Sequence, residues 1–145
     1  MRAVSGPGPT VILTHMAKNL ALLALILGVA SLFLPMTQAL GGQITVGAFS
    51  GTETNPVGAL LLMGPPTFAA LFGATLGRKR FGRGLGTLHL IFGVLGLLMC
   101  SIILGDENVA SGMVQVGIGT YLATAAGLLV LIAGLVGLIK PDPKR

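Results

Sequence analysis

The feature that most constrains this chain is a set of four long apolar segments that contain no Asp, Glu, Lys or Arg. They cover about residues 19–37, 56–77, 85–104 and 115–139. A helix of about 20 apolar residues crosses the ~30 Å hydrocarbon core of a bilayer. Because no water is available there to bond free backbone groups, such segments are expected to be helical. The sequence therefore predicts an all-α membrane protein, a bundle of four transmembrane helices.

The charged residues are divided between the connecting segments according to their sign. All nine basic residues lie before the first apolar segment, between the second and third, or after the fourth. Three of the four acidic residues, Glu53, Asp106 and Glu107, lie in the two other connections. Basic residues mark the cytoplasmic side of a membrane protein. We therefore expect an integral protein of the bacterial cytoplasmic (inner) membrane, with both termini in the cytoplasm.

The composition leaves little of the chain outside a membrane. Charged residues make up 9% of the sequence, against about 25% in an average soluble domain. The net charge of +5 comes from short clusters beside the apolar segments, where attraction to the membrane surface explains it. A nucleic-acid partner is therefore not expected. The single cysteine, Cys100, excludes an intramolecular disulfide.

The parts of the chain outside the bundle are two short tails. Residues 1–18 contain two Gly-Pro pairs and no hydrophobic periodicity, which predicts a flexible cytoplasmic tail. Residues 19–140 form the transmembrane domain, and residues 141–145 form a second cytoplasmic tail. Translation from Met1 and translation from Met16 are both open, since Met16 also precedes a basic residue and the first apolar segment.

The first apolar segment has a second interpretation, as a signal peptide. It follows a basic residue, and small residues near Ala39 resemble a cleavage region. Cleavage there would leave three spans. The apolar stretch from Leu20 to Leu34 is at the long limit for a signal peptide, which favours the uncleaved, four-span form.

Small residues recur at steps of three and four within the apolar segments, a spacing that places them on one face of a helix. Between membrane helices, small residues allow two backbones to approach closely and gain van der Waals contact. We therefore predict helix-packing roles for Ala24, Gly28, Ser31, Gly73, Gly93, Gly96, Gly127 and Gly134. The same faces are also open to contact with a second copy or another subunit.

The second apolar segment contains Pro65 and Pro66 near its centre. Proline removes a backbone donor and disturbs the preceding turn, so we expect a kink there. Neighbouring hydroxyl groups often bond the carbonyls that are freed in this way. Thr67 and Thr75 are the hydroxyls available for this role.

The two outer connections contain short runs with the alternation of a β-strand. Residues 43–46 and residues 113–116 combine β-branched with polar side chains and have glycines nearby. Backbone groups at a membrane surface need partners. We therefore predict a short β-ribbon on the outer face, formed by pairing these two runs, and strand addition by a partner is left open.

His89 is the ionisable side chain within the spans. An ionisable group inside a membrane is by default a candidate for function, and a neutral imidazole on a glycine-lined face is a potential ligand for haem or chlorophyll. The alternative is a structural role in which the imidazole bonds a carbonyl or a lipid headgroup. The bundle has no second histidine to complete a bis-histidine site.

The turn between the second and third spans contains a cluster of cations, Arg78, Lys79, Arg80 and Arg83. Each basic residue near a membrane surface gains about 1 kcal/mol from anionic lipids. This cluster is therefore a candidate site for anionic headgroups, with the lipid bilayer as the partner. Its other interpretation is that it only fixes the orientation of the chain.

Residues that carry catalytic chemistry are missing from the spans. Proton-coupled transport needs a membrane acid, and all four acidic residues lie outside the apolar segments. The sequence has no phosphate-binding loop, metal-spaced histidine cluster or nucleophile–base pair, so we do not expect an enzyme. A passive pore would have to use the scattered hydroxyls of Ser31, Thr67, Thr75 and Thr124.

Several short motifs occur in a characteristic order. Ser31-Leu32-Phe33-Leu34-Pro35 ends the first span, and a β-prone loop and a basic inner turn follow. The closing run is Val116-Gly117-Ile118-Gly119-Thr120-Tyr121-Leu122, followed by Gly127-Leu128-Leu129. This order resembles small four-span bacterial membrane proteins of uncharacterised function over about residues 20–140. The resemblance implies a fold and no activity.

These observations predict a non-enzymatic integral membrane protein that acts as a structural or accessory subunit. Its partners would be further copies of itself or the other subunits of a larger membrane complex. One alternative is a subunit of an electron-transfer or light-harvesting complex that holds haem or chlorophyll through His89. A second alternative is a small passive channel or transporter.

Overall fold

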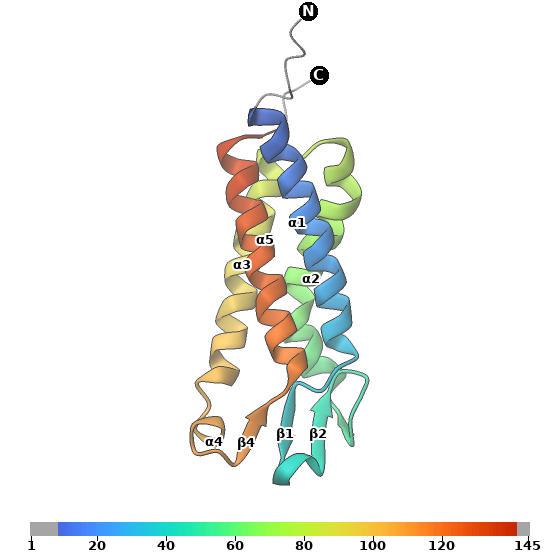
Figure 1. Ribbon diagram of the computed structural model, residues 1–145, viewed down its shortest axis with the longest axis vertical. Helices are drawn as coiled ribbons and strands as arrows, with labels where there is room; N and C mark the ends of the chain where they lie inside the picture. Colours follow the sequence, from blue (N-terminus) through green and yellow to red (C-terminus); the bar gives the residue numbers. More distant parts are fainter. Residues whose placement is uncertain (1–8, 142–145) are drawn as a thin grey trace, which may run out of the picture.

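Four long helices form a bundle in the computed structural model, which describes residues 9–141 (Figure 1). They are α1 (Pro9–Leu32), α2 (Pro56–Lys79), α3 (Arg83–Leu104) and α5 (Ile118–Ile139). Each contains a stretch that is long and apolar enough to cross a membrane. The prediction of a mostly helical chain with four such helices is therefore confirmed.

The helix ends agree with the predicted spans in the middle of the chain and differ at α1. α2 and α3 begin and end within two residues of 56–77 and 85–104. α1 begins at Pro9, so residues 9–18 are helical rather than a flexible tail. Proline suits a first helical position because no amide donor is needed there. Residues 1–8 and 142–145 of the predicted tails lie outside the described part of the chain.

The first helix also ends earlier than predicted, at Leu32 instead of residue 37. Pro35 has no amide hydrogen and disfavours the helical conformation of the residue before it. The chain continues through two tight turns, in which the amides of Phe33 and Leu34 bond the carbonyls of Ala30 and Ser31. Residues from Thr37 onward are then free to form a strand.

A four-stranded sheet covers one end of the bundle (Figure 1). Its strands are β1 (Thr37–Ala39), β2 (Ile44–Gly47), β3 (Glu53–Thr54) and β4 (Val114–Val116), in the order β3-β2-β1-β4. β1 is antiparallel to both β2 and β4, and Thr37 lies opposite Val46 on one side and Val116 on the other. The short helix α4 (Glu107–Ala110) precedes β4.

The sheet corrects two predictions. The runs 43–46 and 113–116 do not pair with each other, because β1 lies between them. The order of the helices explains this arrangement: α1 packs against both α2 and α5, so the strand that leaves α1 lies between the strands that lead to those two helices. The fourth helix begins at Ile118 instead of residue 115, because Val114–Val116 belong to the sheet.

α2 runs through Pro65 and Pro66 as one helix. The expected compensation by threonine is wrong. The hydroxyl of Thr75 donates to Leu71 O at 2.7 Å, a carbonyl that the prolines do not free. The hydroxyl of Thr67 has no hydrogen-bond partner. The proline region instead packs closely against α3, where the ring of Pro66 lies against Gly96.

The core lies along the axis between the four helices and consists mainly of small side chains. α1 and α3 each pack against α2 and α5. Three buried clusters follow one another. They comprise Met36, Ala48, Ala59, Leu62, Met63, Cys100 and Ala123 near the sheet, then Ala24, Ala69, Ala70 and Val130, then Ala17, Ala21, Phe81 and Ala133. Large apolar side chains are instead common on the outer surface of the bundle.

The sheet is fixed to the bundle at the start of α5. Met36 O accepts hydrogen bonds from Gly117 N at 2.6 Å and from the Thr120 hydroxyl at 2.8 Å. The amide of Gly119 donates to Pro35 O at 2.9 Å. A β-carbon on Gly119 would lie 2.7 Å from Leu34 O, so the close approach of the two segments depends on glycine at this position.

Candidate functional site

All the predicted helix-packing residues are buried: Ala24, Gly28, Ser31, Gly73, Gly93, Gly96, Gly127 and Gly134. Their contacts differ in kind. Between α3 and α5 the contacts are made by backbone: a β-carbon on Gly93 would lie 2.8 Å from Leu131 N, and one on Gly134 would lie 2.6 Å from Leu90 N. Gly127 is less constrained, since its β-carbon would lie 3.4 Å from a Leu97 methyl.

The glycines at the other helix pairs face side chains. A β-carbon on Gly28 of α1 would lie 2.5 Å from the Thr67 hydroxyl of α2. One on Gly73 of α2 would collide with the His89 imidazole of α3, and would lie 2.7 Å from the Ala21 methyl of α1. These glycines therefore provide the space that neighbouring polar side chains occupy.

The imidazole of His89 is fully buried between three helices. Its Nδ1 lies 2.8 Å from Leu85 O, one turn earlier in α3. A carbonyl oxygen only accepts hydrogen bonds, so Nδ1 carries the hydrogen in the neutral ring and Nε2 is left with a lone pair. Nε2 has no hydrogen-bond partner and faces Gly73. The Phe81 ring packs edge-on against the imidazole, with the centroids 5.0 Å apart.

The space around Nε2 decides whether His89 fits a haem or a chlorophyll. A metal on a histidine nitrogen needs open space about 2 Å beyond that nitrogen. The macrocycle around the metal needs a much larger space, perpendicular to the metal–nitrogen bond. The Gly73 backbone and the Ala21 methyl occupy this region. The residues present therefore do not fit such a group. Within residues 9–141 there is also no group of three or more His, Cys, Asp or Glu that would hold a metal ion.

Three buried polar side-chain atoms in the described part of the chain lack a hydrogen-bond partner, and each faces a glycine. They are Ser50 Oγ, Thr67 Oγ1 and His89 Nε2, and they lie against Gly47, Gly28 and Gly73 respectively. A glycine Cα–H that points at an oxygen or nitrogen is a weak donor. The recurrence indicates that Cα–H contacts partly replace the missing conventional hydrogen bonds.

The basic turn lies at the end of the bundle opposite the sheet, between α2 and α3 (Figure 1). The side chains of Arg78, Lys79, Arg80 and Arg83 are all exposed. The acidic residues that the structure describes are Glu53 in β3, Asp106 just before α4 and Glu107 in its first turn, all at the sheet end. The two ends of the bundle therefore carry opposite charge.

Phe81 is buried within this basic turn, and no sequence pattern had indicated a role for it. Its ring packs between α2 and α5. A β-carbon on Gly77 of α2 would lie 2.8 Å from the ring, and a β-carbon on Gly137 of α5 would lie 2.5 Å from it. Phe81 thus closes the core at the basic end, beneath the exposed cations. The signal that would have revealed it is one large apolar residue among four charged ones.

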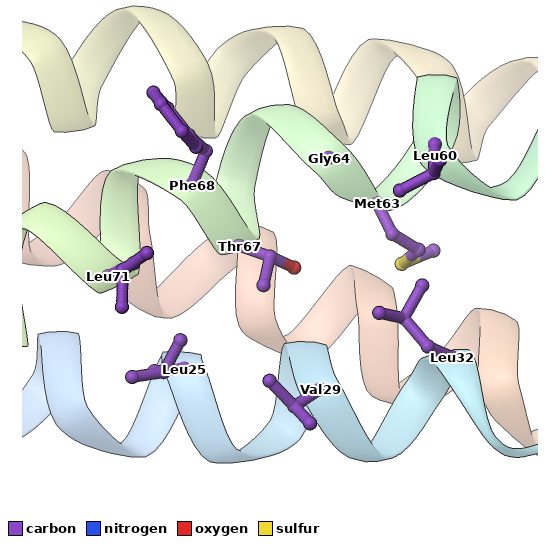
Figure 2. A pocket seen from close by; sticks show the side chains of 9 residues that line it. All are labelled: Leu25, Val29, Leu32, Leu60, Met63, Gly64, Thr67, Phe68 and Leu71. Carbon is purple, nitrogen blue, oxygen red and sulfur yellow. The ribbon is translucent and has the colours of Figure 1, made fainter.

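An apolar groove of about 290 Å³ lies between α1 and α2. Leu25, Val29 and Leu32 line it from α1, and Leu60, Met63, Gly64, Thr67, Phe68 and Leu71 line it from α2. Figure 2 shows Leu25 opposite Leu71 at one end and Leu32 opposite Leu60 at the other. A β-carbon on Gly64 would meet no other atom within 4 Å, so the absence of a side chain there helps to form the groove.

Comparisons of this chain with protein-family models, with curated proteins and with solved structures find no match. Its function is therefore inferred from its own residues.

Proposed function

We propose that this chain is an integral protein of the bacterial cytoplasmic membrane, that its four long helices cross the bilayer, and that both termini are cytoplasmic. The exposed large apolar residues on all four helices support membrane insertion, since such a surface is favourable in lipid and costly in water. The cations at one end and the acids at the other support the orientation.

Site-directed labelling tests the orientation. In a Cys100→Ala background, the variants Arg80→Cys and Asn108→Cys each place one exposed cysteine at an opposite end of the bundle. A membrane-impermeant maleimide added to intact spheroplasts should label position 108 and leave position 80 unlabelled until the membrane is opened. The reverse pattern would refute the orientation, and labelling of both would refute the four-span topology.

We further propose a non-enzymatic, structural or accessory role, within a homo-oligomer or a larger membrane complex. One observation carries this proposal. The fully buried polar side chains that the structure describes are Ser31, His89 and Thr120, and each makes a hydrogen bond to a backbone carbonyl, of Gly28, Leu85 and Met36 respectively. Buried hydroxyl and imidazole groups engaged in this way support packing rather than chemistry.

Native mass spectrometry of the mildly solubilised protein, with an absorption spectrum of the same sample, tests this role. Larger subunits or further copies bound without a visible absorption band are expected. A haem or chlorophyll band that is lost in His89→Ala would instead establish the cofactor-bearing alternative. A colourless single chain that conducts solutes in liposomes would establish the passive channel.

Three of the four hydroxyls named for a passive pore make local bonds, whereas the Thr67 hydroxyl has no hydrogen-bond partner. Ser31, Thr75 and Thr124 donate to carbonyls of their own helices, at 2.6, 2.7 and 2.9 Å. A hydroxyl that bonds its own helix has less capacity to replace the water around a permeating solute. This arrangement favours the accessory role over the channel.

A further inference from the structure

The groove between α1 and α2 opens on the outer surface of the bundle, which the proposed function places in lipid. Leu60, Phe68 and Leu71 are lining residues that are also exposed. None of the side chains that line the groove is charged. Its occupant must therefore present hydrocarbon over the length of the groove.

The same two helix faces continue to the basic end of the bundle. Lys18 precedes Leu25 by seven residues in α1, and Arg78 follows Leu71 by seven residues in α2. Seven residues make about two turns of helix, or about 10 Å, and return to the same face. Ala21 packs beside Gly73 between these positions, so Lys18 and Arg78 lie at a similar level on α1 and α2, beyond the basic end of the groove.

We propose that this groove holds an acyl chain of an anionic phospholipid, whose phosphate lies against Arg78 and Lys18 at the basic end. The proposal rests on the membrane insertion proposed above. Charge complementarity selects the occupant: the cations flank the basic end of the groove, whereas Glu53, Asp106 and Glu107 lie at the opposite end of the bundle. A guanidinium binds a phosphate with several hydrogen bonds, which fixes the headgroup more firmly than charge alone.

Native mass spectrometry tests the proposal on the full chain, in detergent supplemented with either phosphatidylglycerol or phosphatidylcholine of the same acyl composition. The wild-type protein should retain one phosphatidylglycerol in preference to phosphatidylcholine. Arg78→Gln should lower this preference about fivefold, the effect of one juxtamembrane cation. Gly64→Leu should abolish retention of the lipid, because the new side chain, whose β-carbon would meet no other atom within 4 Å, would occupy the groove.

Two matched variants distinguish a specific lipid site from the general attraction of anionic lipids to the basic end of the bundle. Lys140→Gln removes a cation at the end of α5, outside the basic turn, and Gly84→Leu adds the same side chain at a glycine whose β-carbon would also meet no other atom within 4 Å. Both should retain the lipid as the wild type does. Equal losses in Arg78→Gln and Lys140→Gln, or unchanged retention in Gly64→Leu, would refute the site. Equal retention of phosphatidylcholine would refute the headgroup contact.

A separate measurement keeps the two proposals distinguishable. Resistance of the wild-type protein to extraction from membranes by alkaline carbonate tests insertion without reference to any bound lipid. Extraction by carbonate would refute insertion, and with it the lipid site. Resistance to carbonate together with no preference for phosphatidylglycerol would refute the lipid site alone.

Discussion

The contact between Gly28 and Thr67 makes a specific prediction about the α1–α2 interface. In Gly28→Ala the new methyl group would lie 2.5 Å from Thr67 Oγ1, while the Thr67 β-carbon and methyl lie at 3.3 and 3.4 Å. The conflict is therefore with one atom. Relief requires a change of the threonine rotamer or separation of the helices, and overpacking of this kind costs about 1–3 kcal/mol. Thr67→Ala removes that atom.

We expect Gly28→Ala to destabilise the bundle by up to about 2 kcal/mol, after the ~1 kcal/mol gain of alanine over glycine in a helix. Thr67→Ala should recover most of this loss, with a coupling energy of at least about 1 kcal/mol. Unfolding of the four proteins in mixed detergent micelles, followed by circular dichroism, measures the cycle. Gly64→Ala is the matched control, because its methyl would meet no other atom. Additive effects of the two substitutions would contradict the proposed contact.

Three further predictions concern stability in the same unfolding assay. Gly134→Ala should lower the free energy of unfolding by about 1–3 kcal/mol, because its methyl would meet the Leu90 backbone. Gly127→Ala should be neutral or stabilising, and equal effects of the two substitutions would contradict the structure. Thr120→Val should cost about 1 kcal/mol by removing the hydrogen bond to Met36 O, and Thr120→Ser should restore it. Phe81→Ala should lower the stability by about 3–5 kcal/mol, as for other buried aromatic residues. Arg80→Ala, at the exposed residue beside it, should change the stability by less than about 0.5 kcal/mol.

The helix faces could be predicted from the sequence because two requirements coincide. An apolar segment of membrane length must be helical, and the spacing of small residues then determines which side packs. Ala17, Ala21, Ala24, Gly28 and Ser31 are accordingly buried along one side of α1. The spacing of residues shows which side of a helix packs but not which residues of another helix that side contacts. The pattern therefore did not indicate that Gly28 faces Thr67 or that Gly73 faces His89.

The sheet includes a strand, β1, that no sequence pattern predicted. The runs 43–46 and 113–116 were recognisable because their side chains alternate, but Thr37, Gln38 and Ala39 have no such signal and follow an apolar helix. Their position between β2 and β4 depends on the packing of α1 between α2 and α5. Such a tertiary arrangement is not encoded in any local stretch. Phe81 was missed for a related reason, since its burial depends on Gly77 and Gly137 from two other helices.

The same contacts predict which pair of helices separates first. α3 and α5 meet backbone to backbone through Gly86, Gly93 and Gly134, where no rotamer change is available. α1 and α2 meet through glycine and side-chain contacts beside an open groove, and Thr67 can regain a hydrogen bond to its own helix when they part.

Local opening draws on the least stable contacts of a fold. In hydrogen exchange of the detergent-solubilised protein, amides of α2 around Gly64 and Leu71 should therefore exchange before those of α3 around Gly93. Added phosphatidylglycerol should slow exchange in α2 more than in α3, because the proposed acyl chain would contact α1 and α2 only. Earlier exchange in α3 would show that the backbone contacts between α3 and α5 do not dominate the stability of the bundle. Equal slowing of the two helices by the lipid would contradict the proposed position of the acyl chain between α1 and α2.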